Sequence, residues 1–296
     1  MERDLGCDKV QTSVAIRRSG HNRGMSKRSS RRPARSAARA AARSRSAGAP
    51  SVEDLARVVV QGATALLDLD DPLAGEEWAS AVLGNVYKMA VPPEVQDLVD
   101  RELVPSIARL AEARGDTAGR AVLEALAAVV DPADVAPVRE AAGRMAGRGI
   151  AVPAWAGELR TAELTGAWLV TDAAGDHEGY YAVFRYPGRD PHLLTAVVDK
   201  AAGEIVKDAS LGQLVGDPAS VLEALAAAEP GFSVRPVDPA AMARRIVEAI
   251  EAGDRLRDTE GTEGFRRTRA LLLARMRSTQ GRIVNAPPSS GPTTSK

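Results

Sequence analysis

The densest group of side chains that could do chemistry lies in one short stretch of the chain. Asp172, Asp176, His177 and Glu178 are close in sequence, and carboxylate oxygens with an imidazole nitrogen are donors that can hold a divalent metal. Aspartate and glycine are also the ordinary residues of a hairpin turn, and that interpretation is favoured. As an alternative function, the same residues together with Asp199 are candidates for the acidic site of a hydrolase. No metal and no cofactor is predicted.

The other histidine of the folded region, His192, is not expected to join this group. If a turn at 188–191 pairs Pro187 with His192, His177 lies about ten residues away along the strand, on the order of 30 Å at roughly 3.3 Å per residue. The two histidines therefore cannot share one metal. Charged residues also flank the next hairpin, where cross-strand salt bridges are expected rather than acid–base catalysis: Asp199, Lys200, Lys207 and Asp208.

The charges of the chain are unevenly distributed. The totals are 39 Lys+Arg and 39 Asp+Glu, but residues 1–50 hold 13 Lys+Arg against 3 Asp+Glu, which leaves 26 against 36 for residues 51–296. A segment of net charge +10 (13 − 3) thus precedes a body of net charge −10 (26 − 36). Residues 26–45 are expected either to contact a polyanion weakly or to neutralise the acidic body. The arginines expected to contact a polyanion are Arg28, Arg31, Arg32, Arg35, Arg39, Arg43 and Arg45.

Residues 51–150 show helical periodicity throughout. Ser51 followed by Asp54 predicts a capping box at the start of the first helix, whose apolar stripe runs to Leu69. Pro105 is expected to kink or restart a later helix, because proline cannot donate the interior hydrogen bond. Short breaks at proline and glycine between the helices predict antiparallel neighbours in a bundle or in stacked pairs.

The hydrophobic period changes near Ala151, and an antiparallel meander of four strands is expected beyond it. The expected strands are 163–172, 179–187, 192–200 and 204–210. The second and third are apolar on both faces, so helices are expected to cover both sides of the sheet. The expected core residues are Tyr181, Val183, Phe184, Leu194, Val197 and Val198. A short extended segment at 232–237 and helices at 217–228, 238–252 and 263–278 follow.

The predicted fold class is α+β, with a helical N-terminal half, a four-stranded antiparallel meander and C-terminal helices. The expected organisation is a disordered basic tail at 1–50, a helical region at 51–150, the sheet with its C-terminal helices at 151–280, and a disordered end at 281–296. Strands that are apolar on both faces need more helices packed against them than the C-terminal helices alone supply. The helical region and the sheet region can therefore form one unit.

Three short runs resemble a pattern in uncharacterised proteins of GC-rich Gram-positive bacteria. They are Ala-Val-Val-Asp-Lys at 196–200, Ile-Val-Lys-Asp-Ala at 205–209 and Val-Arg-Pro-Val-Asp-Pro at 234–239. The resemblance covers roughly residues 52–280. It implies no activity, and no functional residue is carried over from it.

Composition and motifs bound the function. Cys7 is the one cysteine, so a cytoplasmic location is expected, and no apolar run reaches the ~18 residues of a membrane helix. The sequence has no Gly-x-Ser-x-Gly elbow, no P-loop and no dinucleotide-binding glycine pattern. A non-enzymatic interaction or regulatory module is the favoured function. The alternatives are a hydrolase with an acidic site near Asp172 to Glu178 and non-specific nucleic-acid association through the Arg-rich tail.

Overall fold

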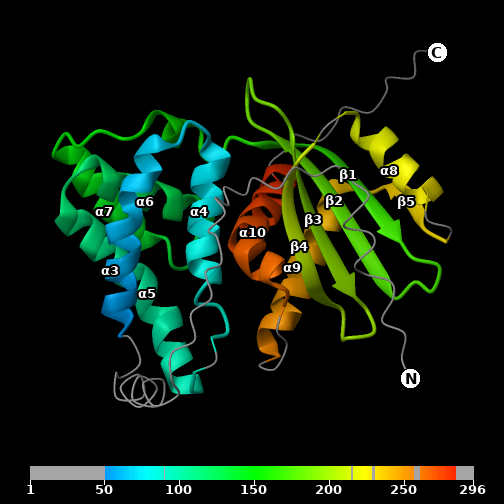
Figure 1. Ribbon diagram of the computed structural model, residues 1–296, viewed down its shortest axis with the longest axis horizontal. Coiled ribbons are helices and arrows are strands. Elements are labelled where there is room, and N and C mark those ends of the chain that lie inside the picture. The colour runs from blue at the N-terminus through cyan, green and yellow to red at the C-terminus, as the bar shows by residue number, and fades with distance from the viewer. Residues whose placement is uncertain (1–50, 90, 215, 229–230, 257–260, 285–296) are drawn as a thin grey trace, which may run out of the picture.

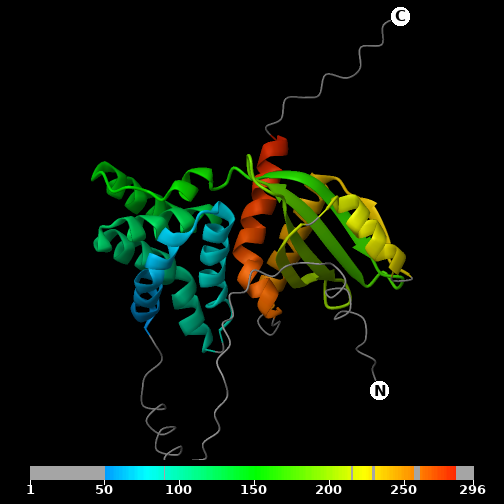
Figure 2. The same ribbon diagram turned by 45° about the horizontal axis from the view of Figure 1, so that its top comes forward.

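The computed structural model of the chain describes residues 51–89, 91–214, 216–228, 231–256 and 261–284. The expected basic tail at 1–50, with the seven arginines proposed to contact a polyanion, lies outside the described residues. The expected disordered end at 281–296 is corrected in part, because residues 281–284 form the last turn of a helix and only 285–296 lie outside. Helices lie on one side of the molecule and a sheet on the other, with helix α10 between them (Figures 1 and 2).

Six elements build the helical half. They are α3 (Val52–Gln61), the 3-10 helix η1 (Gly62–Asp68), α4 (Pro72–Gly84), α5 (Pro93–Arg114), α6 (Thr117–Val129) and α7 (Ala136–Gly147). Ser51 and Asp54 form the predicted capping box at the start of α3. Asp71 and Asp116 accept backbone N–H groups at the starts of α4 and α6 in the same way. These caps satisfy donors that have no partner within the helix.

Two local predictions for this half are wrong. The first helix does not run unbroken to Leu69, because α3 ends at Gln61 and the chain continues from Gly62 as a 3-10 helix that buries Leu66. Pro105 does not restart a helix, since α5 continues through it to Arg114. Buried side chains on both sides of Pro105, among them Val104 and Ile107, supply packing energy that offsets the lost hydrogen bond.

The sheet has five strands, one more than predicted. Its order is β4-β3-β2-β1-β5, and the strands are β1 (Glu163–Thr171), β2 (His177–Arg185), β3 (His192–Asp199), β4 (Ile205–Gln213) and β5 (Ser233–Pro236). The first four form the predicted antiparallel meander, and the α+β class is confirmed. The added strand is the segment predicted to be extended. It pairs antiparallel with β1 from Trp168↔Pro236 to Thr171↔Ser233, a long-range contact that local pattern does not specify.

Four further elements complete the fold: the 3-10 helix η2 (Ala154–Glu158), α8 (Pro218–Ala228), α9 (Pro239–Arg255) and α10 (Glu263–Val284). Helices α9 and α10 cover one face of the sheet, where Phe184, Leu194 and Val198 are buried. Tyr181 and Val183 are buried on the opposite face in a smaller cluster that includes Leu222 of α8. Six residues were predicted to belong to the main core, and Phe184, Leu194 and Val198 do so. The prediction is wrong for Tyr181 and Val183, which lie in the smaller cluster, and for Val197, which is only partly buried.

Helix α10 joins the two halves by packing antiparallel against α4. Gly84 lies so close to α10 that a Cβ added to it would be 2.1 Å from the backbone oxygen of Arg266. One turn earlier, the Ser80 hydroxyl donates to the Arg267 carbonyl at 2.6 Å and accepts from the Leu271 N–H at 3.1 Å. Small residues on α4 therefore let the two helix backbones approach closely.

A buried ion pair lies at the far end of this helix contact. An Arg275 Nη2 donates to Glu76 Oε2 and to the Tyr186 hydroxyl, each at 2.5 Å, and the Arg160 N–H donates to the other Glu76 oxygen at 3.1 Å. The Tyr186 ring stacks on His192 with 5.6 Å between centroids. The pair thus connects α4, α10 and the sheet at one point in the interior.

Candidate functional site

The structure brings together three of the five residues predicted for an acidic site. His177 Nδ1 is hydrogen-bonded to Asp172 Oδ2 at 2.9 Å, and its Nε2 lies 3.7 Å from Asp199 Oδ2. The contact with Asp199 follows from strand register, since His177 and Asp199 are paired across β2 and β3. Asp176 donates its backbone N–H to Asp172 Oδ1 at 3.0 Å, which closes the turn. Although burial opposes it, the bonds from His177 and from the turn's backbone lower the pKa of Asp172.

Glu178 does not belong to this group, because successive side chains of a strand point to opposite faces. Its carboxylate accepts from Arg245 Nε and from the Tyr180 hydroxyl, both at 3.1 Å. Burial and the Glu178 charge raise the pKa of Tyr180 to about 12. Of the predicted hairpin salt bridges one is present, with Lys207 Nζ 3.6 Å from Asp199 Oδ2. Lys200 pairs instead with Glu178, at 3.9 Å, and Asp208 accepts from the Thr262 hydroxyl.

The geometry of these residues does not form a metal site. Within the part of the chain that the structure describes, no three His, Cys, Asp or Glu side chains are placed to hold a metal ion. His192 is paired with Phe184, at the opposite end of the β2–β3 ladder from His177. Seven residues separate the two positions on β2, on the order of 23 Å at 3.3 Å per residue. The expected pairing of Pro187 with His192 is wrong, since His192 pairs with Phe184, but the two histidines still lie too far apart to share one metal.

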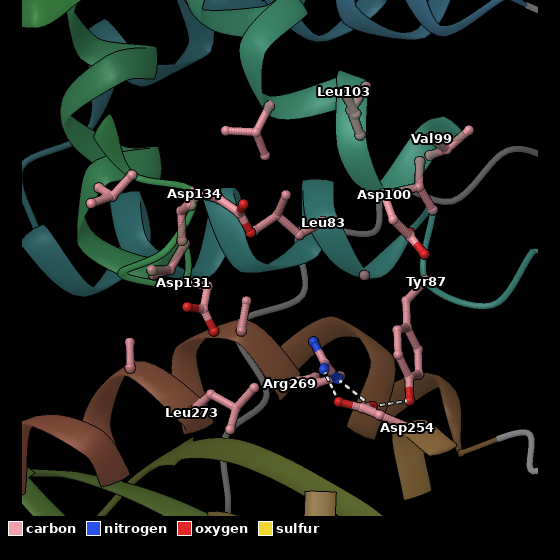
Figure 3. Close-up of a pocket in the computed structure, with 18 of the residues that line it drawn as sticks. Leu83, Tyr87, Val99, Asp100, Leu103, Asp131, Asp134, Asp254, Arg269 and Leu273 are labelled. Atoms are coloured by element: carbon pink, nitrogen blue, oxygen red, sulfur yellow. Dashed lines mark hydrogen bonds and ion pairs between the residues drawn. The ribbon is translucent and has the colours of Figure 1, made fainter. Parts of the chain in front are cut away.

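A cleft of about 990 Å³ lies between the helical half and α10. It is formed by the end of α4, the loop after it, the first half of α5, the end of α6 and one side of α10, with Asp254 of α9 at its base (Figure 3). Its walls combine apolar and charged side chains, and the apolar ones include Leu83, Val86, Val99, Leu103, Val129 and Leu273. None of the residues near His177 lines it.

The base of the cleft is a closed set of polar contacts around Asp254. The Tyr87 hydroxyl donates to Asp254 Oδ1 at 2.6 Å, and Arg269 donates from Nε to the same oxygen at 3.1 Å and from Nη2 to Oδ2. The Arg269 guanidinium also lies over the Tyr87 ring, 4.6 Å from its centroid. Burial, followed by the bond to Asp254, raises the pKa of Tyr87. Tyr87 therefore remains a hydrogen-bond donor, and the charges of Asp254 and Arg269 neutralise each other.

Further carboxylates stand on the walls. Asp100 points into the cleft from α5, while Asp131 and Asp134 lie on the opposite side, after the end of α6 (Figure 3). Asp100 Oδ1 accepts from Gln96 Nε2 at 2.7 Å, and Asp131 forms an ion pair with Arg277. Desolvation, with the nearby Asp97 charge, raises the pKa of Asp100. The Gln96 bond and the Arg269 charge oppose this shift, and the Asp100 residue is exposed to solvent.

Among the described residues, two of the three non-glycine positions with positive φ line this cleft, the third being Glu204 in the β3–β4 turn. Lys88 and Arg160 both line it, and their φ values of 48° and 63° lie in the left-handed region that favours glycine. The side chain of Lys88 donates to the Gly253 carbonyl at 2.7 Å, and Arg160 Nη1 donates to the Ala127 carbonyl at 3.2 Å. Strain of this kind costs about 1–3 kcal/mol per residue and is typical of ligand sites.

A smaller hollow of about 260 Å³ lies between η1 and α4 and includes Trp78 and Glu77. Burial raises the pKa of Glu77. This hollow lacks the converging polar groups of the large cleft, which is therefore the better candidate site.

The sequence did not indicate the cleft. Its residues come from separate helices, and the pairing of Tyr87 with Asp254 joins positions far apart in the chain. One signal is present in the sequence, because the last helix carries several arginines and residues 51–296 have a net negative charge, so that arginine–carboxylate pairs are expected. Arg269 and Arg277 form such pairs, with Asp254 and Asp131.

Among the helices that the structure describes, none combines the length and the apolar character needed to span a membrane. Comparison of this chain with protein-family models, with curated proteins and with solved structures finds no match.

Proposed function

We propose that this chain is a non-enzymatic interaction or regulatory protein, and that it binds a mainly apolar small molecule in the cleft between the helical half and α10. The cleft itself is the observation that carries this proposal. Its volume of about 990 Å³ falls at the upper end of the ~300–1,000 Å³ range of small-molecule sites. Apolar side chains beside polar groups that converge, as Tyr87 and Arg269 do on Asp254, are also typical of such sites.

The polar groups of the cleft support binding rather than catalysis. Asp254, Arg269 and Tyr87 are engaged with one another, whereas nucleophilic catalysis requires a nucleophile in contact with a base. The strained residues Lys88 and Arg160 each donate to backbone carbonyls. These contacts fix the walls before a ligand arrives, and such preorganisation favours binding.

The hydrolase alternative is supported by one geometric feature, the contact of His177 with both Asp172 and Asp199. A histidine oriented by a carboxylate can act as a general base. The group does not line the large cleft, so it ranks second. Hydrolysis of p-nitrophenyl acetate by the full chain, lost on His177→Ala, would establish it, and equal rates in both proteins would remove it.

Polyanion contact through residues 26–45 and a cytoplasmic location also remain proposals. Both rest on composition: the basic segment supplies cations that can neutralise phosphates, and the lone Cys7 suits a reducing compartment.

Fluorescence of N-phenyl-1-naphthylamine, an apolar dye, tests the main proposal. Leu83→Trp should fill the cleft and abolish binding of the dye, and Ala274→Leu, a smaller change on the same wall, should weaken it. Val58→Trp is the matched control, because Val58 is 66% exposed on α3 and does not line the cleft. Equal dye binding by all four folded proteins, including the unchanged chain, would overturn the proposal.

A further inference from the structure

The two halves of the protein have separate hydrophobic cores, and helix α10 contributes to both. Leu271 of α10 packs in the core of the helical half, whereas Leu272 and Met276 pack in the core between α10 and the sheet. Each half therefore keeps its own core if the contact between α4 and α10 loosens. Such a loosening would change the shape of the cleft, because its walls belong to both α4 and α10.

Four buried side chains join the two halves, and we call this group the junction: Glu76, Tyr186, His192 and Arg275. His192 is 4% exposed, and its ring stacks on Phe184 and Tyr186 with centroids 6.0 and 5.6 Å away. The Arg275 guanidinium lies against the same two rings, 5.4 Å from the centroid of Phe184 and 5.1 Å from that of Tyr186. The strand neighbours of His192, Phe184 and Gln213, carry no charge. A neutral histidine therefore lies beside a buried cation.

The groups that face His192 do not balance a proton on it. Arg275, from α10, is already positive, and Tyr186, after β2, is a neutral phenol whose pKa is raised by burial and by the Glu76 charge. The Glu76 carboxylate, from α4, already accepts from Arg275 at 2.5 Å and from the Arg160 N–H at 3.1 Å. Burial, followed by the Arg275 charge, lowers the pKa of His192 to about 3. Protonation would thus add a second buried cation where Glu76 already neutralises Arg275, which is costly without water.

We propose that the junction is an acid-sensitive latch, in which protonation of His192 loosens the contact between α4 and α10 and so releases the ligand of the cleft. The proposal rests on the proposed function, because it describes how binding at the same site is regulated. Water reaches the junction in the loosened form, so the pKa of His192 returns there to its ordinary value of 6.5. Each pH unit below 6.5 therefore favours the loosened form by up to about tenfold. A ligand that binds only the closed form loses affinity as the loosened form is populated.

Dye binding as a function of pH tests the latch on the full chain. The affinity for N-phenyl-1-naphthylamine would be measured from pH 7.5 to pH 4.5 in the unchanged chain, in His192→Phe and in His177→Phe. We expect the unchanged chain to release the dye in this range, and His192→Phe to release it at a pH lower by about one unit or more. His177→Phe is the matched control, because the His177 side chain is 37% exposed, is bound to Asp172 and does not line the cleft. This control should release the dye at the same pH as the unchanged chain.

Amide hydrogen exchange locates the opening and needs neither a variant nor the dye. The Arg160 N–H is bonded to Glu76 and the Leu271 N–H to the Ser80 hydroxyl, so both amides report on the contact between α4 and α10. After correction for the intrinsic effect of pH on exchange, their protection should fall between pH 6.5 and pH 4.5, while amides in the middle of β2 and β3 stay protected. Equal loss of protection in β2 and β3 would show global unfolding. Unchanged protection of Arg160 and Leu271 would show that the contact stays closed in acid, and either result overturns the latch.

The outcomes separate the latch from the proposed function. If the dye binds in the cleft at pH 7.5 and its affinity stays constant down to pH 4.5, the latch is wrong and the proposed function stands. The same holds if the unchanged chain and His192→Phe release the dye at the same pH. If Leu83→Trp leaves dye binding at pH 7.5 unchanged, the proposed function fails and ligand release fails with it. Hydrogen exchange still decides in that case whether the junction opens in acid.

Discussion

At the scale of single residues, the interior of this protein depends on a buried charge pair. Glu76 is 1% exposed and Arg275 is 5% exposed, so neither charge is solvated by bulk water. The Arg275 Nε has no hydrogen-bond partner among the described residues, and the pair therefore depends on the bonds to Glu76 and Tyr186. Desolvation of both charges opposes their attraction, so such a pair adds little net stability. Its main effect is to fix the position of α4 relative to α10.

Glu76→Gln is expected to destabilise the protein by about 3–5 kcal/mol, because it leaves the buried Arg275 charge without a counter-charge. Urea denaturation followed by circular dichroism measures the change. The double variant Glu76→Leu/Arg275→Met should recover more than half of the unfolding free energy that Glu76→Gln loses, since it removes both charges. A double variant as unstable as Glu76→Gln would show that the polar contacts, and not the unpaired charge, determine the cost.

His192 should make stability depend on pH. Burial, with the nearby Arg275 charge, lowers the pKa of His192 to about 3, whereas the unfolded chain has an ordinary value of about 6.5. Between these values the unfolded state binds the proton and the folded state does not. Stability from this group is therefore complete above pH 6.5 and falls towards pH 3, by up to about 1.4 kcal/mol per pH unit.

The variant His192→Phe should remove this contribution, because phenylalanine can stack between Phe184 and Tyr186 without titrating. Unfolding free energies of both proteins would be measured from pH 7.5 to pH 4.5. We expect the variant to lose less stability than the unchanged chain over that range. Parallel plots of unfolding free energy against pH for the two proteins would show that His192 is protonated in the folded protein or titrates normally.

The sequence predicted contacts between side chains only where the residues lie close together in the chain. Asp172 and His177 share a turn, so their contact was predictable, and strand register added Asp199. The partners of Glu76, Tyr87 and Arg269 are determined by how helices pack, and no local pattern carries that information. This is why the acidic turn was found and the cleft was not.

At the scale of elements, the helices and the meander follow from periodicity and from caps such as Ser51 with Asp54. Errors arose where tertiary packing overrides a local preference. Helix α5 passes through Pro105, and β5 forms because β1 offers a free edge to an extended segment. Helix α10 extends beyond its predicted end at Ser278, where the Thr279 hydroxyl donates back to the Arg275 carbonyl at 3.0 Å.

The contact between α4 and α10 is a property of these two elements and can be tested at one glycine. Gly84→Ala should destabilise the protein strongly, because its Cβ would lie 2.1 Å from the Arg266 carbonyl oxygen and the backbones must separate. Gly143→Ala on α7 is the matched control, since nothing lies within 4 Å of its Cβ. Thermal unfolding should show this control to be unchanged or more stable, by up to about 1 kcal/mol. Equal effects of the two substitutions would contradict the close approach.

At the scale of the whole molecule, the opposed charges of residues 1–50 and of the rest of the chain require a test on the full protein. Neutralising Arg31, Arg35, Arg39 and Arg43 to glutamine should weaken binding to a labelled DNA duplex, measured by fluorescence anisotropy. For about six engaged phosphates, log K should fall against log salt with a slope near −5, and the loss of four contacts should reduce it to near −2.

Identical binding by the two proteins would remove these arginines from the interaction. If neither protein binds DNA, neutralisation of the acidic body by the basic segment becomes the better account, because net charges of +10 and −10 are of equal size.

The central claim is that the cleft between the helical half and α10 binds a ligand. The most direct measurement is methyl NMR of the full chain during titration with N-phenyl-1-naphthylamine. We predict that the methyl signals of Leu83, Leu103 and Leu273 shift and show intermolecular contacts with the dye, while Leu193 and Leu222, buried on the far face of the sheet, do not. Shifts at Leu193 and Leu222 with unchanged cleft methyl signals would contradict the claim.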